Sequence, residues 1–168
     1  MSSQLADKIR DPEQWFLQFE ALDDLRRVNK FYPELLFRFM GQYEPFIKES
    51  VDNLRSGISK NSLMFVHEFF KGQHHASSPE HLSISVAFVK SALPNILHKT
   101  VYDKVFISNE ANHAVLNCLK TCLYKETLQV LINDGCDNKL NNIKLKEKSY
   151  GYLSNFVENS DASFFLWA

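Results

Sequence analysis

The chain has 168 residues and a formal net charge of −1, with 45% apolar residues, 14 Phe, five Gly and five Pro. This length predicts a single domain over 1–168, and the apolar content excludes a disordered chain because it is sufficient for a core. Few Gly and Pro exclude an all-β chain with many tight turns, and a net charge near zero gives no global attraction to nucleic acid or acidic membranes.

Charge is unevenly distributed along the chain. Residues 1–53 carry seven Lys/Arg and ten Asp/Glu, whereas 54–168 carry twelve and ten. The segment 139–148 holds four Lys and one Glu. This local basic segment is either a solvated helix face or a binding patch.

The cysteines and the first residues indicate the compartment. The chain has three cysteines, an odd number, and they form no CxxC motif; they are Cys118, Cys122 and Cys136. Residues 1–15 contain no apolar segment of the kind found in signal peptides, and no apolar run approaches the ~18 residues that span a membrane. We therefore expect a cytoplasmic protein with reduced thiols.

The first half of the chain predicts three helices. Asp11-Pro12-Glu13-Gln14 starts the first, with Asp11 as cap, and the helix runs to about Asn29. It ends at Tyr32-Pro33 because a residue before Pro avoids the helical region. An apolar stripe from Leu35 to Leu54, with Gly41 and Pro45 as interruptions, predicts the second helix, and a stripe over 58–72 predicts the third.

The second half predicts four more helices after a loop at 73–78. Ser78-Pro79-Glu80 starts the fourth helix, in which Pro94 predicts a kink or a broken last turn. The fifth begins near Ser108. The sixth runs from about Lys125 to Gly135, and the seventh begins near Asn142.

Every stripe has a period of ~3.6 residues, and no period of two competes with it. The fold class is therefore all-α, with about seven amphipathic helices. A compact bundle would fit, but wide apolar faces favour an α-solenoid of HEAT-like antiparallel helix pairs with roughly three to four repeats. Similar polar and basic openings at 53–60, 103–109 and 139–146 recur at about the spacing of such repeats.

Four segments resemble TOG domains of the crescerin and CLASP-like type. Residues 15–27 read WFLQFEALDDLRR, in which Trp15 is followed six residues later by Ala21 and then by leucines, as in that family. The segments 30–36, 54–63 and 104–115 resemble later parts of the same domain, so the likeness extends over about 11–160. TOG domains usually hold about six repeats, whereas this chain has room for roughly three and a half.

The resemblance implies a non-catalytic module that binds tubulin or microtubules, often in cilia or axonemes. TOG domains are HEAT-repeat paddles that bind through the loops along one edge. The residues that this implies as partner-binding are Trp15, Arg55, Lys60, Lys104, Lys139 and Lys144. Family members often carry basic residues after the Trp, where this chain has Phe16 and Gln18, and often have Arg at the position of Lys144.

The alternative is a HEAT-type adaptor that binds another protein, with Trp15 buried and its apolar surface elsewhere. The apolar tail at 161–168, with Phe164 to Trp167, is either a docking patch or a cap on the end of the stack. We expect no enzyme, metal or cofactor, because no nucleotide-binding or nucleophile motif is present. His74-His75 is expected to be a polar loop, and Cys118 and Cys122 to be buried.

Overall fold

The computed structural model describes residues 14–72 and 78–160. Within these ranges all regular elements are helical, so the predicted all-α class is confirmed. They are α2 (Trp15–Phe31), α3 (Pro33–Val51), α4 (Ser56–Gly72), α5 (Pro79–Lys99), α6 (Val105–Thr121), α7 (Lys125–Val130), the π-helix η2 (Leu131–Cys136) and α8 (Ile143–Asn159). No helix of these ranges is both long and apolar enough to cross a membrane.

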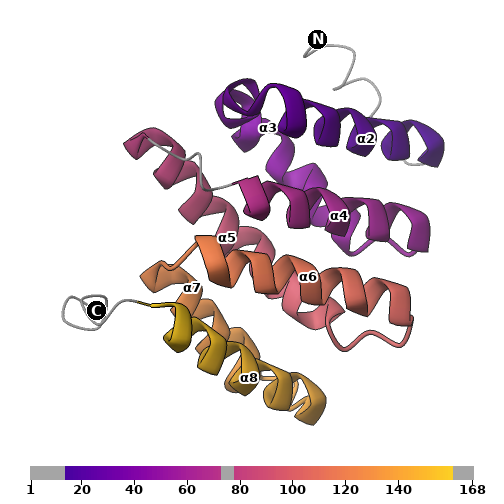
Figure 1. The fold of residues 1–168 in the computed structure, drawn as a ribbon. Helices are drawn as coiled ribbons and strands as arrows, with labels where there is room; N and C mark the ends of the chain where they lie inside the picture. The colour runs from indigo at the N-terminus through magenta and orange to yellow at the C-terminus, as the bar shows by residue number, and fades with distance from the viewer. Residues whose placement is uncertain (1–13, 73–77, 161–168) are drawn as a thin grey trace.

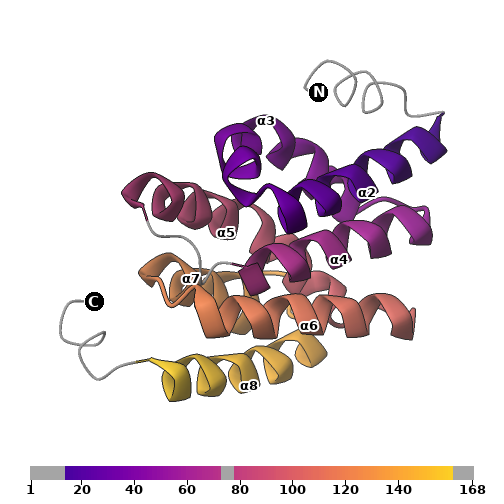
Figure 2. The same ribbon diagram turned by 45° about the horizontal axis from the view of Figure 1, so that its top comes forward.

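The helices form two layers. α2, α4, α6 and α8 lie side by side in one layer, and α3, α5 and α7 with η2 lie behind them (Figures 1 and 2). All four helices of the first layer begin along the right side of Figure 1 and run in the same direction. The loops that precede α4, α6 and α8 therefore share one edge of the molecule, although long stretches of chain separate them.

Several predicted helix ends are confirmed by their local contacts. Tyr32 separates α2 from α3, and Pro33 begins α3. The Ser78 side chain accepts a hydrogen bond of 3.1 Å from the backbone N–H of His81, as an N-cap does. Asn142 caps α8 in the same way, through the N–H of Leu145 at 3.2 Å. The predicted cap Asp11, the loop 73–77 and the tail 161–168 lie outside the described residues.

The interruptions expected at Gly41 and Pro45, and the broken last turn expected at Pro94, were wrong. α3 continues through Gly41 and Pro45, and α5 continues through Pro94 to Lys99. Each proline has buried apolar residues within two positions on both sides, so tertiary packing outweighs the cost of the missing backbone hydrogen bond. The fifth helix starts at Val105, earlier than predicted, and Leu54 lies in the loop before α4 with 92% of its surface exposed.

The core between the two layers is richest in aromatic rings where α3, α4 and α5 meet. Phe69 of α4 packs edge-on against Phe88 of α5, with ring centroids 5.0 Å apart. Phe37, Phe65 and Phe70 surround this pair at centroid distances of 5.8 to 6.1 Å. Such tilted contacts stabilise aromatic pairs beyond the burial of their area.

The C-terminal end is packed by a close backbone approach. A Cβ placed on Gly135 of η2 would lie 2.5 Å from Ser149 Oγ of α8, so only glycine fits without a shift. The sequence predicts Gly135 as a helix stop, but the chain remains helical to Cys136 as a π-helix. The glycine therefore serves the contact between η2 and α8.

Candidate functional site

The six residues predicted to bind a partner lie where the first-layer helices begin. We call this region, made of the first turns of α2, α4, α6 and α8 and the loops before them, the loop edge (Figure 1). The predicted residues on it are Trp15, Arg55, Lys60, Lys104, Lys139 and Lys144. The alternation of helices between two layers brings them to one side, because each helix pair returns the chain to the same edge.

Trp15 and Arg55 are neighbours on the loop edge. The Arg55 guanidinium carbon lies 5.8 Å from the centre of the Trp15 ring, within the range of a cation–π contact. The backbone N–H of Arg55 donates to the Asn53 side chain at 2.9 Å, which orders the loop. Trp15 keeps 47% of its surface exposed. It therefore presents an aromatic ring to solvent beside a cation.

A second basic and aromatic group joins the starts of α4 and α6. The Lys60 ammonium lies 6.0 Å from the centre of the Phe106 ring. Lys104, the N-cap residue of α6, donates a hydrogen bond through Nζ to Ser56 Oγ at the start of α4. Phe106 is half exposed. The sequence reasoning missed Phe106, although its position two residues after Lys104 could have indicated it.

Lys139 and Lys144 lie on either side of the start of α8 and are both exposed. Leu140 and Ile143 between them are also largely exposed. Among the described residues, no hydrogen bond, ion pair or ring contact joins either lysine to the group around Trp15 and Lys104. The loop edge thus consists of a connected part on α2, α4 and α6 and a separate part on α8.

The electrostatics of the loop edge favour an acidic partner. Asp52, the acidic residue before α4, is paired with the Lys99 ammonium at 3.3 Å and with the Asn95 amide. Asp103 remains exposed beside Lys104. Four helix N-termini also point at this edge and add partial positive charge. The balance on the α4, α6 and α8 part of the edge is positive, because six lysines and arginines stand there against Asp52, Asp103 and the exposed Asp137.

Exposed apolar side chains concentrate at the same place. Eight of the fourteen large apolar residues exposed in the described ranges belong to the loop edge. They are Trp15, Phe16, Leu54, Tyr102, Val105, Phe106, Leu140 and Ile143. Aromatic anchors among cations are typical of protein-binding surfaces.

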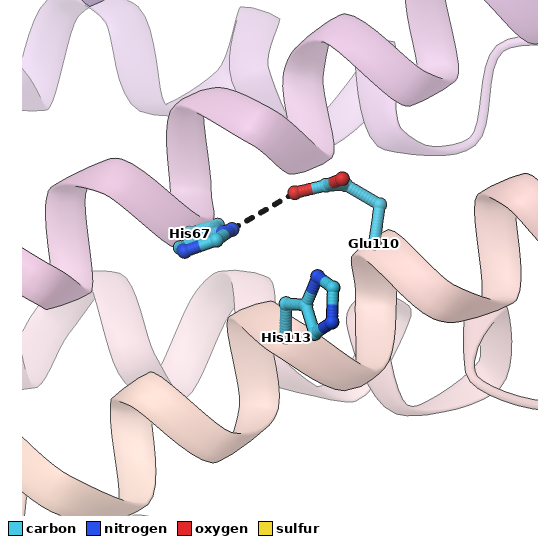
Figure 3. A group of neighbouring side chains, drawn as sticks. All are labelled: His67, Glu110 and His113. Carbon is cyan, nitrogen blue, oxygen red and sulfur yellow. Dashed lines mark hydrogen bonds and ion pairs between the residues drawn. The ribbon is translucent and has the colours of Figure 1, made fainter.

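Away from the loop edge, polar side chains join neighbouring first-layer helices. Arg26 of α2 binds the Glu68 carboxylate of α4 at 2.6 Å and the Asn61 side chain at 3.1 Å. The hydrogen bond with Glu68 raises the pKa of Arg26 above its ordinary value. In the next pair, His67 Nδ1 of α4 lies 2.9 Å from Glu110 Oε1 of α6, with His113 beside them (Figure 3).

The cysteines do not form a nucleophilic site with His113. All three are buried, as predicted for Cys118 and Cys122. Burial raises the pKa of Cys118 well above its ordinary value, while the hydrogen bond with Cys118 lowers that of Cys122. His113 is exposed and faces His67. The predicted polar loop His74-His75 lies outside the described residues.

No protein-family model matches the chain, and neither a curated protein nor a solved structure matches it. The TOG resemblance therefore stays a prediction that rests on the residues of the four segments.

Proposed function

We propose that the chain is a non-catalytic protein-binding module that binds tubulin or the microtubule lattice through the loop edge. The observation that carries this proposal is the row formed by Trp15 with Arg55, Lys60 with Phe106, and Lys104. Such a row suits an acidic protein surface, because the rings bury apolar area while the cations speed association and fix orientation.

Tubulin is named as the partner because of the sequence resemblance. Its surface is acidic, and TOG domains bind it along the corresponding edge. The crescerin-like branch of the family acts in cilia, so the proposed location is the cytoskeleton, with the axoneme as the specialised case. The exposed position of Trp15 supports this reading over an adaptor in which the Trp is buried.

A specific observation favours an adaptor as the second candidate. At the opposite end of α2, Phe31 and Tyr32 are each 63% exposed. A groove beside them is lined by Arg26, Lys30, Phe37 and Lys71, among others. A HEAT-type adaptor would hold its partner at this end, and the loop edge would then be ordinary solvated surface.

Co-sedimentation with taxane-stabilised microtubules and size exclusion with free tubulin test the proposal. The test variant is Trp15→Ala with Lys104→Glu, which changes the starts of α2 and α6. Its matched control is Phe31→Ala with Lys120→Glu, which makes the same kinds of change near the ends of the same two helices. All four residues are exposed, so both variants should fold like the wild type.

We expect the wild type and the control to bind, and the test variant to bind at least tenfold more weakly. Binding should also weaken as salt is raised, because the contact is between a basic edge and an acidic surface. Loss of binding in the control variant alone would move the contact to the far end of α2. A folded wild type that binds neither form of tubulin would overturn the tubulin proposal and leave the adaptor.

A further inference from the structure

His67, Glu110 and His113 bring three metal-ligating side chains together between α4 and α6. Each offers one ligand atom, and these atoms all lie within 4.8 Å of one another. The rings of His67 and His113 meet edge to face with centroids 5.6 Å apart. All three side chains face the same space between the two helices (Figure 3).

The positions of these residues on their helices explain why they converge. Glu110 and His113 are three residues apart on α6, so they share one face of that helix. His67 lies near the middle of α4, which packs alongside α6. All three belong to helix interiors, where the backbone is fixed, and sites built on helices hold their ligands more precisely than sites on loops.

We propose that His67, Glu110 and His113 bind one divalent transition-metal ion of the zinc class, which clamps α4 to α6. Two imidazoles and one carboxylate are ligands that zinc prefers, whereas calcium and magnesium require a set made of oxygens. His113 is exposed, so water can supply the remaining ligand. This inference does not depend on the proposed tubulin contact.

Only a small adjustment converts the cluster into a metal site. Ligand atoms around a tetrahedral zinc ion lie about 2.0–2.2 Å from the metal, and therefore roughly 3.4 Å from one another. The His67–Glu110 contact of 2.9 Å would lengthen slightly, and no ligand atom of the cluster lies more than 4.8 Å from another. The separations are therefore close to those that a zinc ion requires.

The charged residues around the cluster are compatible with a bound cation, because the nearby Arg26 is neutralised by other carboxylates. Arg26 is close enough to Glu110 for the carboxylate to raise the pKa of the guanidinium. Glu68 holds Arg26 through three hydrogen bonds of 2.6 to 3.2 Å, and Asp23 lies 3.5 Å from it. The arginine charge is thus compensated by Glu68 of α4 and Asp23 of α2, and the Glu110 carboxylate remains available to the metal.

Isothermal titration of the full chain with Zn²⁺, after removal of metal by a chelator, tests the site. A parallel titration with Co²⁺ reports the coordination through the visible spectrum of the bound ion. The variants are His113→Ala and Glu110→Gln. The matched control is His98→Ala, which removes a histidine of α5 outside the cluster. The double variant His74→Ala/His75→Ala serves as a second control, because adjacent histidines could bind metal themselves.

We expect one Zn²⁺ per chain in the wild type and in both controls. His113→Ala and Glu110→Gln should each weaken binding by at least tenfold. Zn²⁺ at about 100 times its dissociation constant should raise the Tm of the wild type by about 5–10 °C. It should raise the Tm of His113→Ala much less. His113 and Glu110 lie outside the core cluster, so circular dichroism of these variants should match the wild type without metal.

Four results would overturn the proposal. Equal Zn²⁺ binding by His113→Ala and the wild type would remove His113 from the site. Loss of binding in the His74→Ala/His75→Ala variant would assign the metal to those histidines. A thiolate charge-transfer band in the Co²⁺ spectrum would assign it to cysteine, and the absence of saturable binding to the folded wild type would show that the cluster holds no metal.

Discussion

Two regions of the molecule, one around α4 and α5 and the other at the C-terminal end, are held together in different ways. Where α3, α4 and α5 meet, the layers are joined by large aromatic rings such as Phe69 and Phe88. Where η2 meets α8, the Ser149 side chain lies so close to the backbone of Gly135 that a Cβ there would not fit. Hydrogen bonds also stabilise this C-terminal region. The Tyr152 hydroxyl and the Lys148 ammonium of α8 both donate to the Asn112 side chain of α6.

This difference indicates where the molecule tolerates change. An aromatic cluster derives its stability from buried area and loses it in proportion to the volume removed. A close backbone contact has little area to lose, but it cannot accept added volume. The N-terminal part should therefore be sensitive to truncation of side chains, and the C-terminal part to their enlargement.

Phe69→Ala should have the largest effect. Phe69 has no exposed surface and contacts four other aromatic rings. We expect the free energy of unfolding to fall by about 3–5 kcal/mol, measured by urea denaturation. A loss below about 1 kcal/mol would mean that the aromatic cluster contributes little to the stability of the region where α3, α4 and α5 meet.

Gly135→Ala tests the close approach at the other end. The added methyl group would meet Ser149, so we expect a loss of about 1–3 kcal/mol in thermal or urea unfolding. Gly151→Ala is the matched control, because Gly151 lies within α8 and a Cβ there meets nothing within 4 Å. The control should be stabilised by about 0.5–1 kcal/mol. Similar effects of the two changes would contradict the packing described for η2.

Tyr152→Phe probes the polar support of α8 and has a pH signature. At neutral pH the loss of the hydrogen bond to Asn112 should cost about 0.5–1.5 kcal/mol. Burial raises the pKa of Tyr152 from 10.0 to about 12. The neutral phenol is thus favoured in the folded chain, and this stabilisation is complete below pH 10 and is lost as the pH rises to 12.

The variant lacks this phenol and cannot show that loss. The difference in unfolding free energy between wild type and Tyr152→Phe should therefore shrink above pH 10 and reverse in sign as the pH approaches 12, in urea titrations at several pH values. A difference that stays constant over this range would mean that Tyr152 is not buried in the way described.

The features of the fold that could be predicted from the sequence are those that depend on local pattern. Stripes of period ~3.6 predicted the helices, and Tyr32-Pro33 and Ser78 marked boundaries through the geometry of proline and of a capping side chain. The similar openings before α4, α6 and α8 predicted helix-pair repeats because they recur at the spacing of such repeats, whereas their common edge was implied by the TOG resemblance. These features each arise within a few residues.

The remaining features depend on neighbours that are distant in sequence. His67 and Glu110 are 43 residues apart, and only the packing of α4 on α6 brings them to 2.9 Å. Gly135 appeared to be a helix stop, since its role depends on Ser149 of another helix. The prolines at 45 and 94 stay within helices because their buried neighbours determine the local structure. Single-sequence patterns carry no information about such contacts.

Site-directed photocrosslinking can locate the proposed contact between the loop edge and its partner. Benzoylphenylalanine is placed at Phe106, on the loop edge, or at Phe31, at the far end of α2. Both are exposed phenylalanines, at 47% and 63%. With purified microtubules, the account predicts a crosslink to tubulin from position 106 and little from position 31. A crosslink from position 31 alone, or equal weak labelling from both, would contradict it.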